Sequence, residues 1–157
     1  AETAGRVRTA AGKAVRPLTP TLLELPETPA RERYSKHVKA LIQVGQQRSD
    51  HVATELGYPA ELVPLENPYA LPRGRALRVR TLVDGAPAPN QYVLYGGRTP
   101  NGGRFEQRSV RSDSTGVARI PLRAPGIWYI KFINMAPIQG DTVDYESKWA
   151  TLTFQVR

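Results

Sequence analysis

Much of the chain alternates between apolar and polar residues with a period of two, which is the pattern of β-strands with one buried face. In residues 77–83, Leu77, Val79, Thr81 and Val83 point one way, and Arg78 and Arg80 point the other. In residues 127–133, Trp128 and Phe132 share the face that we expect to be buried in the core. The same reasoning predicts about seven strands. They cover residues 36–44, 77–83, 92–95, 106–112, 117–122, 127–133 and 149–156, and a brief extended stretch covers 59–64.

Short turns separate these segments at the intervals typical of an antiparallel β-sandwich. Residues 84–85 are Asp-Gly, a strong hairpin signal, and Asp113 with Gly116 closes another hairpin. We expect Gly96-Gly97 to end the strand before it, and residues 137–147 to form a long polar loop. The sequence therefore predicts an all-β, Ig-like or transthyretin-like antiparallel sandwich with little helix.

The segment around residue 40 fits two patterns. Tyr34, Val38 and Leu41 have the spacing of one helix face, whereas residues 40–44 alternate as a strand does. We favour a strand over 36–44.

Residues 1–30 show no sustained period, so we expect an extended arm ahead of a sandwich domain at 31–157. A single short helical turn over 21–25 is the most helix that this arm supports. Its prolines lower the entropy cost of ordering the arm on a partner. The first residues, Ala-Glu-Thr, fit either a mature terminus after signal-peptide removal or the boundary of a fragment. The arm residues that we expect to bind a partner are Arg6, Arg8, Arg16, Leu22 and Leu23.

Composition narrows the classes of function. The 157 residues include 14 prolines and 13 glycines but no cysteine, so disulfides and thiolate chemistry are excluded. No apolar run is long enough to cross a bilayer, so we expect no transmembrane segment. The net charge is +8, but the arginines are scattered and no nucleic-acid-binding motif accompanies them. This distribution favours an acidic protein surface or an anionic membrane surface over nucleic acid.

Several stretches of the sequence resemble stretches of known protein families and occur in the same order along the chain. The runs LRVRTLVDGAPAPNQYVLY, RSDSTGVARIPL and APGIWYIKF, within 77–132, resemble the carboxypeptidase-regulatory or transthyretin-like sandwich. The runs RERYSKHVKALIQVG, AELVPLENPYAL and DYESKWATLTFQV resemble the DUF4198 family of exported bacterial proteins, which is related to periplasmic components of nickel uptake. This resemblance covers 31–157, about four-fifths of the chain. It implies a periplasmic location and a metal- or solute-binding accessory role, although Asn134 stands where that family commonly has histidine.

Candidate metal ligands are few and widely spaced. A tight transition-metal site needs three or four converging ligands, and the chain has only two histidines. The three acidic residues within 141–146 lack the spacing of a calcium-binding loop. The weak candidates are His37, His51, Asp141, Asp144 and Glu146. We expect His37 on a strand face, His51 at a loop edge, and no metal or other cofactor.

Catalytic motifs are missing from the sequence. No Gly-x-Ser-x-Gly elbow and no phosphate-binding glycine loop before a helix is present. We therefore expect a protein that is not an enzyme.

Two aromatic residues near the C-terminus are candidates for partner binding. Trp149 stands on the polar face of its strand, where it either caps the core edge or joins Tyr145 in an exposed patch. The leading hypothesis is a non-enzymatic scaffold of the bacterial envelope, an extrinsic subunit of a larger membrane-associated complex. The alternatives are a periplasmic nickel-type metal or solute-binding protein and a carbohydrate-binding module.

Overall fold

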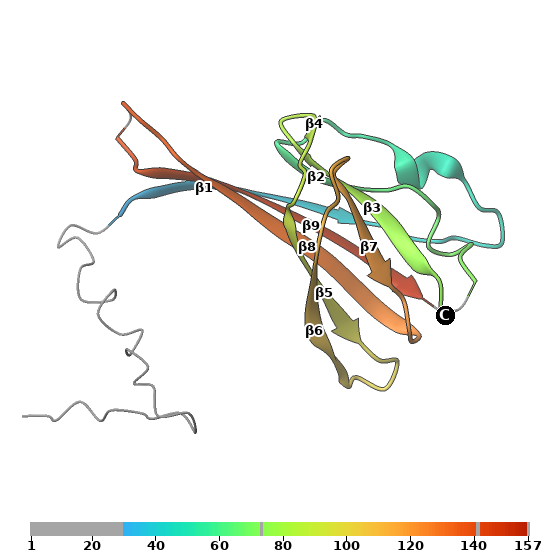
Figure 1. Cartoon of the computed structure of the whole chain (residues 1–157). Helices are drawn as coiled ribbons and strands as arrows, with labels where there is room; N and C mark the ends of the chain where they lie inside the picture. Colours follow the sequence, from blue (N-terminus) through green and yellow to red (C-terminus); the bar gives the residue numbers. More distant parts are fainter. Residues whose placement is uncertain (1–29, 73, 141, 157) are drawn as a thin grey trace, which may run out of the picture. The chain divides into compact units, whose positions relative to one another are not determined.

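The computed structural model describes residues 30–72, 74–140 and 142–156, and Arg31–Arg157 form one compact unit. The described residues form nine strands in two sheets, so the predicted all-β sandwich is confirmed (Figure 1). The strands are β1 (Glu32–Ala40), β2 (Ala60–Pro64), β3 (Ala76–Val83), β4 (Ala86–Pro87), β5 (Tyr92–Arg98), β6 (Arg104–Arg111), β7 (Val117–Pro121), β8 (Gly126–Pro137) and β9 (Tyr145–Val156). A short 3₁₀ turn, η2 (Asp50–Ala53), is the helical element in this part of the chain.

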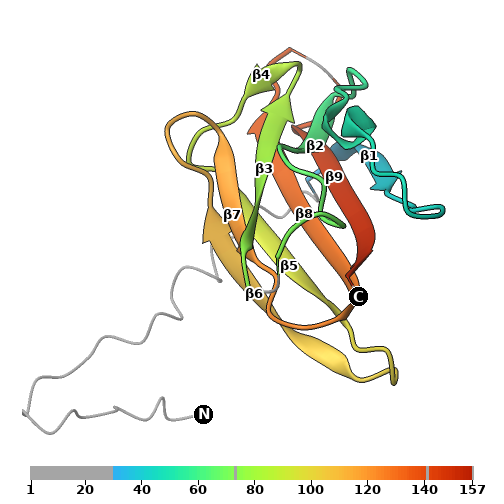
Figure 2. The same cartoon turned by 90° about the vertical axis from the view of Figure 1, so that its right-hand side faces the viewer.

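The strands are divided between a five-stranded and a four-stranded sheet. The first has the order β1-β9-β8-β5-β6, and in the second β3 pairs with β2, β4 and β7. Figure 2 shows β3 in front of β8 and β9. All pairings are antiparallel except that of β1 with β9, which is parallel and departs from the expected antiparallel pattern. The reason is that no hairpin joins these two strands: the chain leaves β1 for β2 in the other sheet and reaches β9 last.

The core lies between the two sheets and is built from the alternating apolar positions of their strands. Trp128 and Phe132 are buried in it, as predicted. The indole N–H of Trp128 donates to the Ala124 carbonyl oxygen at 3.0 Å, so the polar atom of this buried ring is satisfied. Other fully buried members of the core are Leu62, Leu77, Val79, Val93, Ile120, Ile130 and Leu152.

The first strand lies four residues earlier than predicted. It covers Glu32–Ala40 rather than 36–44, and Ile42 and Val44 are exposed. Pairing ends because the Leu41 carbonyl oxygen accepts the Tyr69 hydroxyl at 2.7 Å, while the side chain of Gln43 donates to carbonyls of its own loop.

The glycine pair after residue 95 does not end its strand, contrary to the prediction. β5 continues through Gly96 and Gly97 to Arg98, with an irregular register opposite β6. A Cβ at Gly97 would lie 2.2 Å from the Ile127 carbonyl oxygen, so glycine is needed there for close approach of the neighbouring strand.

The predicted loop at 137–147 is shorter than expected because β8 ends at Pro137 and β9 starts at Tyr145. Both strands, together with β1, continue past the last core positions as a three-stranded extension, residues 32–36, 133–137 and 145–149 (Figure 1).

The remaining predicted elements agree with the structure within about two residues. The stretch at 59–64 is a full strand, β2, and the two-residue β4 was not predicted. The predicted helical turn at 21–25 and residues Arg6, Arg8, Arg16, Leu22, Leu23 and Asp141 lie outside the described residues.

Candidate functional site

The five-stranded sheet has one face in the core and one face that points away from it. Because Ala150, Leu152 and Phe154 are buried, the alternate residues of β9 point outward, Trp149 among them. We call the outward side chains of this sheet the outer face. Its members used below are Tyr34, Lys36, Tyr92, Arg111, Tyr129, Lys131, Ile133, Met135, Tyr145 and Trp149.

The pairing of three strands gathers the apolar side chains of the outer face into rows. Trp149 has Lys36 of β1 on one side and Ile133 of β8 on the other. In the next row, Tyr34 and Met135 flank a serine of β9. Tyr34 is 63% exposed and Met135 is 55% exposed, so these side chains lie open to a partner.

Cations lie over the aromatic rings of the outer face. The Lys36 ammonium is 5.2 Å from the ring centre of Tyr34 and 4.8 Å from that of Trp149. In the same way, Arg111 stands 5.5 Å from the ring of Tyr92. Lys131 stands 5.4 Å from the ring of Tyr129. The outer face is therefore aromatic and basic at once.

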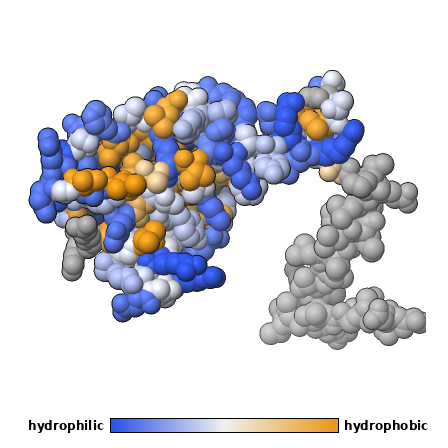
Figure 3. All heavy atoms as spheres, turned by 180° about the vertical axis from the view of Figure 1, so that it is seen from behind, coloured by the Kyte–Doolittle hydropathy of each residue, from blue (hydrophilic) through white to orange (hydrophobic). Residues whose placement is uncertain are grey.

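The two aromatic residues singled out from the sequence lie on this face. The Trp149 indole N–H donates to the hydroxyl of Ser147 at 2.9 Å, which fixes the ring in a half-buried position. Tyr145 is 40% exposed at the start of the same strand. Figure 3 shows one side of the molecule, where apolar residues form patches among hydrophilic residues on the body of the sandwich. On the same side, the extension carries an apolar side chain between hydrophilic ones.

Sequence reasoning missed Tyr34, Lys36, Ile133 and Met135 as members of this surface. Each follows the alternation of its own strand, but their meeting depends on the registers of β1 and of β8 against β9. A local pattern contains no information on that register.

The candidate metal ligands that the structure describes do not form a metal site. His37 lies in β1 and stacks on Tyr58 with ring centres 5.3 Å apart, and one ring nitrogen is 3.1 Å from the Ser35 hydroxyl. His51 is exposed in η2. The described residues hold no group of three or more side chains arranged to bind a metal ion.

The carboxylates of Asp144 and Glu146 bind groups of the protein itself. Asp144 accepts the backbone N–H of Arg31 at 2.7 Å. Glu146 accepts from Arg33 at 3.3 Å and lies 3.5 Å from the Lys148 ammonium. The contacts with Arg31 and Arg33 join the β1 and β9 sides of the extension.

A buried carboxylate that was not singled out from the sequence joins the two sheets at one edge. Glu61 of β2 forms an ion pair with Lys39 of β1 and accepts the backbone N–H groups of Leu56, Gly57 and Tyr58 at 2.7, 3.0 and 3.3 Å. Burial raises the pKa of Glu61, but the hydrogen bonds from Lys39 and the backbone outweigh burial and hold its pKa below the ordinary value. We interpret this cluster as structural because all its donors are satisfied internally.

Two further findings concern the class of protein. Among the described residues, no helix combines the length and apolar character needed to cross a membrane. One family model, described as a domain of unknown function (DUF4198), matches residues 3–136. The match begins ahead of the resemblance seen in the sequence and stops before residues 144–156, which that resemblance included. Comparison with curated proteins gave no match, and neither did comparison with solved structures.

Proposed function

The chain belongs to the DUF4198 family, whose description states no activity, and we propose that it is a non-enzymatic binding module of the bacterial envelope. In this proposal it acts as an extrinsic accessory subunit of a membrane-associated protein complex. The observation that supports this most is the outer face, where exposed aromatic, aliphatic and basic side chains share one rigid sheet.

The composition of the outer face suits a protein partner. Tyrosine, tryptophan and methionine are enriched in protein interfaces. Here Tyr34, Met135 and Tyr145 are exposed around the half-buried Trp149. A tryptophan held in place by its neighbours is a typical anchor of binding energy.

The charge of the outer face favours an acidic partner. Lys36, Lys131 and Arg111 all stand over rings on this face. A carboxylate approaching one of these cations would contact the charge and the apolar surface beside it, and the attraction would speed association. The same contacts rank a protein above a carbohydrate, because a sugar stacks on open ring faces. A cation lies over each of four rings of this face, those of Tyr34, Tyr92, Tyr129 and Trp149.

The strands hold this surface in place before a partner arrives. The extension is tied by Asp144, by the Arg33–Glu146 ion pair and by the ladder between β1 and β9. Binding to an ordered surface avoids the entropy cost of fixing loops.

The proposal is tested by native recovery of the protein from membranes, with identification of partners and metal analysis of the same sample. The variant Tyr34→Ser/Met135→Ser removes two exposed apolar side chains from the outer face. The matched control, Ile42→Ser/Leu56→Ser, removes two exposed apolar side chains from elsewhere. We expect the unaltered protein and the control to recover a stoichiometric partner and the outer-face variant to lose it, with all three unfolding at the same urea concentration.

Equal recovery by both variants would refute binding through the outer face. Recovery of the chain alone with near-equimolar nickel or another metal would favour the metal-binding alternative instead.

The expected contribution of the arm has its own test. Deletion of residues 1–29 should leave a folded domain that no longer joins its complex, and retained assembly would contradict that role.

A further inference from the structure

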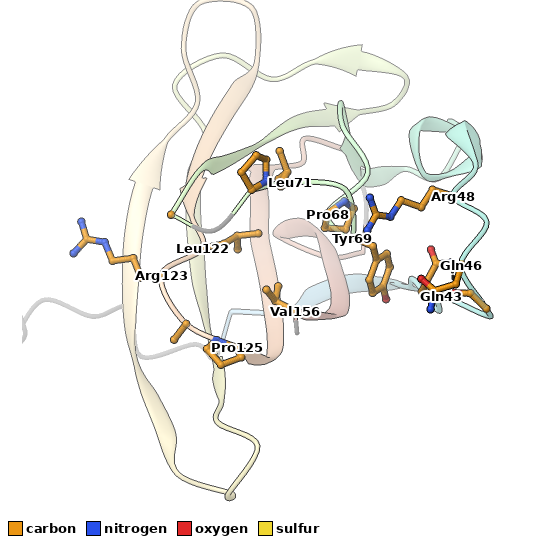
Figure 4. A pocket seen from close by; sticks show the side chains of 14 residues that line it. Gln43, Gln46, Arg48, Pro68, Tyr69, Leu71, Leu122, Arg123, Pro125 and Val156 are labelled. Carbon is orange, nitrogen blue, oxygen red and sulfur yellow. Dashed lines mark hydrogen bonds between the residues drawn. The ribbon is translucent and has the colours of Figure 1, made fainter.

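A cavity of about 400 Å³ opens at the end of the sandwich where β9 finishes. Residues 43–48, 68–72 and 122–125 surround it, and Val156 stands at its side (Figure 4). It shares no residue with the outer face. Its volume is within the range of cavities that bind small organic molecules in proteins.

One wall of this cavity is apolar and continuous with the core. Leu122 is buried, and Tyr69, Leu71 and Val156 pack against the core cluster from its edge. The Tyr69 ring is fixed in place because its hydroxyl donates to the Leu41 carbonyl oxygen at 2.7 Å.

The charged side chains of the lining are both cationic. Arg48 and Arg123 belong to the lining, and neither Asp nor Glu does. In Figure 4 the Arg48 side chain reaches inward above Tyr69, whereas Arg123 points away from the cavity. Arg48 forms no ion pair within the part of the chain that the structure describes, although Arg33, Arg78, Arg80 and Arg108 each form one.

The loop that carries Arg48 is held in shape from within. The Gln43 amide donates to the carbonyl oxygens of Val44, Gly45 and Gln47 at 3.3, 3.1 and 2.8 Å. The Asn67 amide donates to the Ser49 carbonyl oxygen at 3.1 Å and so joins this loop to the one bearing Tyr69. The backbone that carries Arg48 and the loop that bears the apolar wall are therefore held together before any ligand binds.

We propose that this cavity binds an organic anion, a carboxylate on an aromatic or aliphatic body. The Arg48 guanidinium would form a charge-assisted hydrogen bond with the carboxylate, and the body would cover Tyr69, Leu71 and Val156. An inorganic anion would leave the apolar wall exposed to water, and a neutral apolar ligand would leave the cation without a partner. The carboxylate could come from a free small molecule or from the C-terminus of a protein.

The test is an NMR titration of the full chain with 4-phenylbutyrate and with its neutral match, 4-phenylbutanamide. We expect phenylbutyrate to shift backbone signals in 43–48 and 122–125. The amide should bind at least about tenfold more weakly, because it loses one charge-assisted hydrogen bond. Arg48→Gln should weaken phenylbutyrate binding by a similar factor. Arg104→Gln, which alters an exposed arginine outside the cavity lining, should leave binding unchanged.

Three results would overturn the proposal: no shifts up to the solubility limit, equal affinity for both probes, or full affinity in Arg48→Gln. A short peptide ending in phenylalanine, with a free or an amidated C-terminus, separates the two sources of the carboxylate. Tighter binding of the free peptide than of phenylbutyrate assigns the site to a protein C-terminus, and weaker binding assigns it to a small molecule. Arg48→Gln leaves the outer face intact, so the outcome is independent of the proposed assembly role.

Discussion

Replacing the buried carboxylate at the edge of the sandwich should cost a large share of the stability of the domain. Glu61 is 2% exposed, and the Lys39 side chain that pairs with it is 10% exposed. In Glu61→Gln the ammonium loses its counter-charge in a largely buried place. Removing one partner of a buried ion pair costs about 3–5 kcal/mol. Because the glutamine oxygen still accepts one or two of the three backbone N–H groups, we expect about 3 kcal/mol.

A loss of that size is measurable against a domain stability of about 5–15 kcal/mol. It corresponds to a fall in the melting temperature of roughly 10 °C for a chain of this length. Urea unfolding gives the free energy directly, and an unchanged dependence on urea concentration shows that the unfolded state is unaltered.

A double-mutant cycle separates the ion pair from the backbone contacts. Lys39→Met alone leaves the Glu61 carboxylate with three backbone donors, so we expect a smaller loss than in Glu61→Gln. The double variant Lys39→Met/Glu61→Gln should lose less than the sum of both, because no charge remains unpaired. If Glu61→Gln unfolds within about 0.5 kcal/mol of the parent, or if the two losses simply add, the reasoning is wrong.

Three further predictions follow from the surroundings of Glu61, Gly97 and Ser112. Since the pKa of Glu61 is held below its ordinary value of 4.5, its contribution to stability is present above that pH and is lost as pH falls through the folded-state pKa. Urea titrations at decreasing pH should show this loss in the parent and a flatter acid limb in Glu61→Gln. Gly97→Ala should cost about 2 kcal/mol or more, because the new methyl group meets the Ile127 backbone at 2.2 Å; an unchanged urea midpoint would contradict the close approach. Ser112 is buried and its hydroxyl donates to the Ala88 carbonyl oxygen at 2.7 Å, so Ser112→Ala should lose about 1 kcal/mol in the same assay.

The sequence predicted those parts of the fold that depend on near neighbours. The turn at residues 113–116 forms as expected because the Asp113 side chain accepts the N–H groups of Thr115 and Val117. The burial of Trp128 and Phe132 follows from simple alternation. In these places the local pattern and the final structure depend on the same contacts.

The errors occur where a distant partner decides the structure. Ile42 and Val44 alternate like strand residues, but β1 ends before them because Tyr69 takes the carbonyl oxygen of Leu41. The glycines at 96–97 resemble a turn and instead allow Ile127 to approach. The outer face shows the same limit. Trp149 was identified by the alternation of its strand, and Tyr145 was expected in the polar loop before it, but the neighbours of both on β1 are fixed only by the parallel register.

That parallel pairing also sets the order in which the domain can fold. The Arg31 N–H and the Asp144 carboxylate join residues 113 positions apart, and every bond between β1 and β9 spans a similar distance along the chain. During synthesis, the first strand of the sandwich therefore has no partner until the last strand has been made. Closing such a long loop is slow. The β5–β6 hairpin can form early from local contacts, and the β8–β9 hairpin can form as soon as β9 has been made. The outer face is completed only when β1 docks on β9, in one of the last steps of folding.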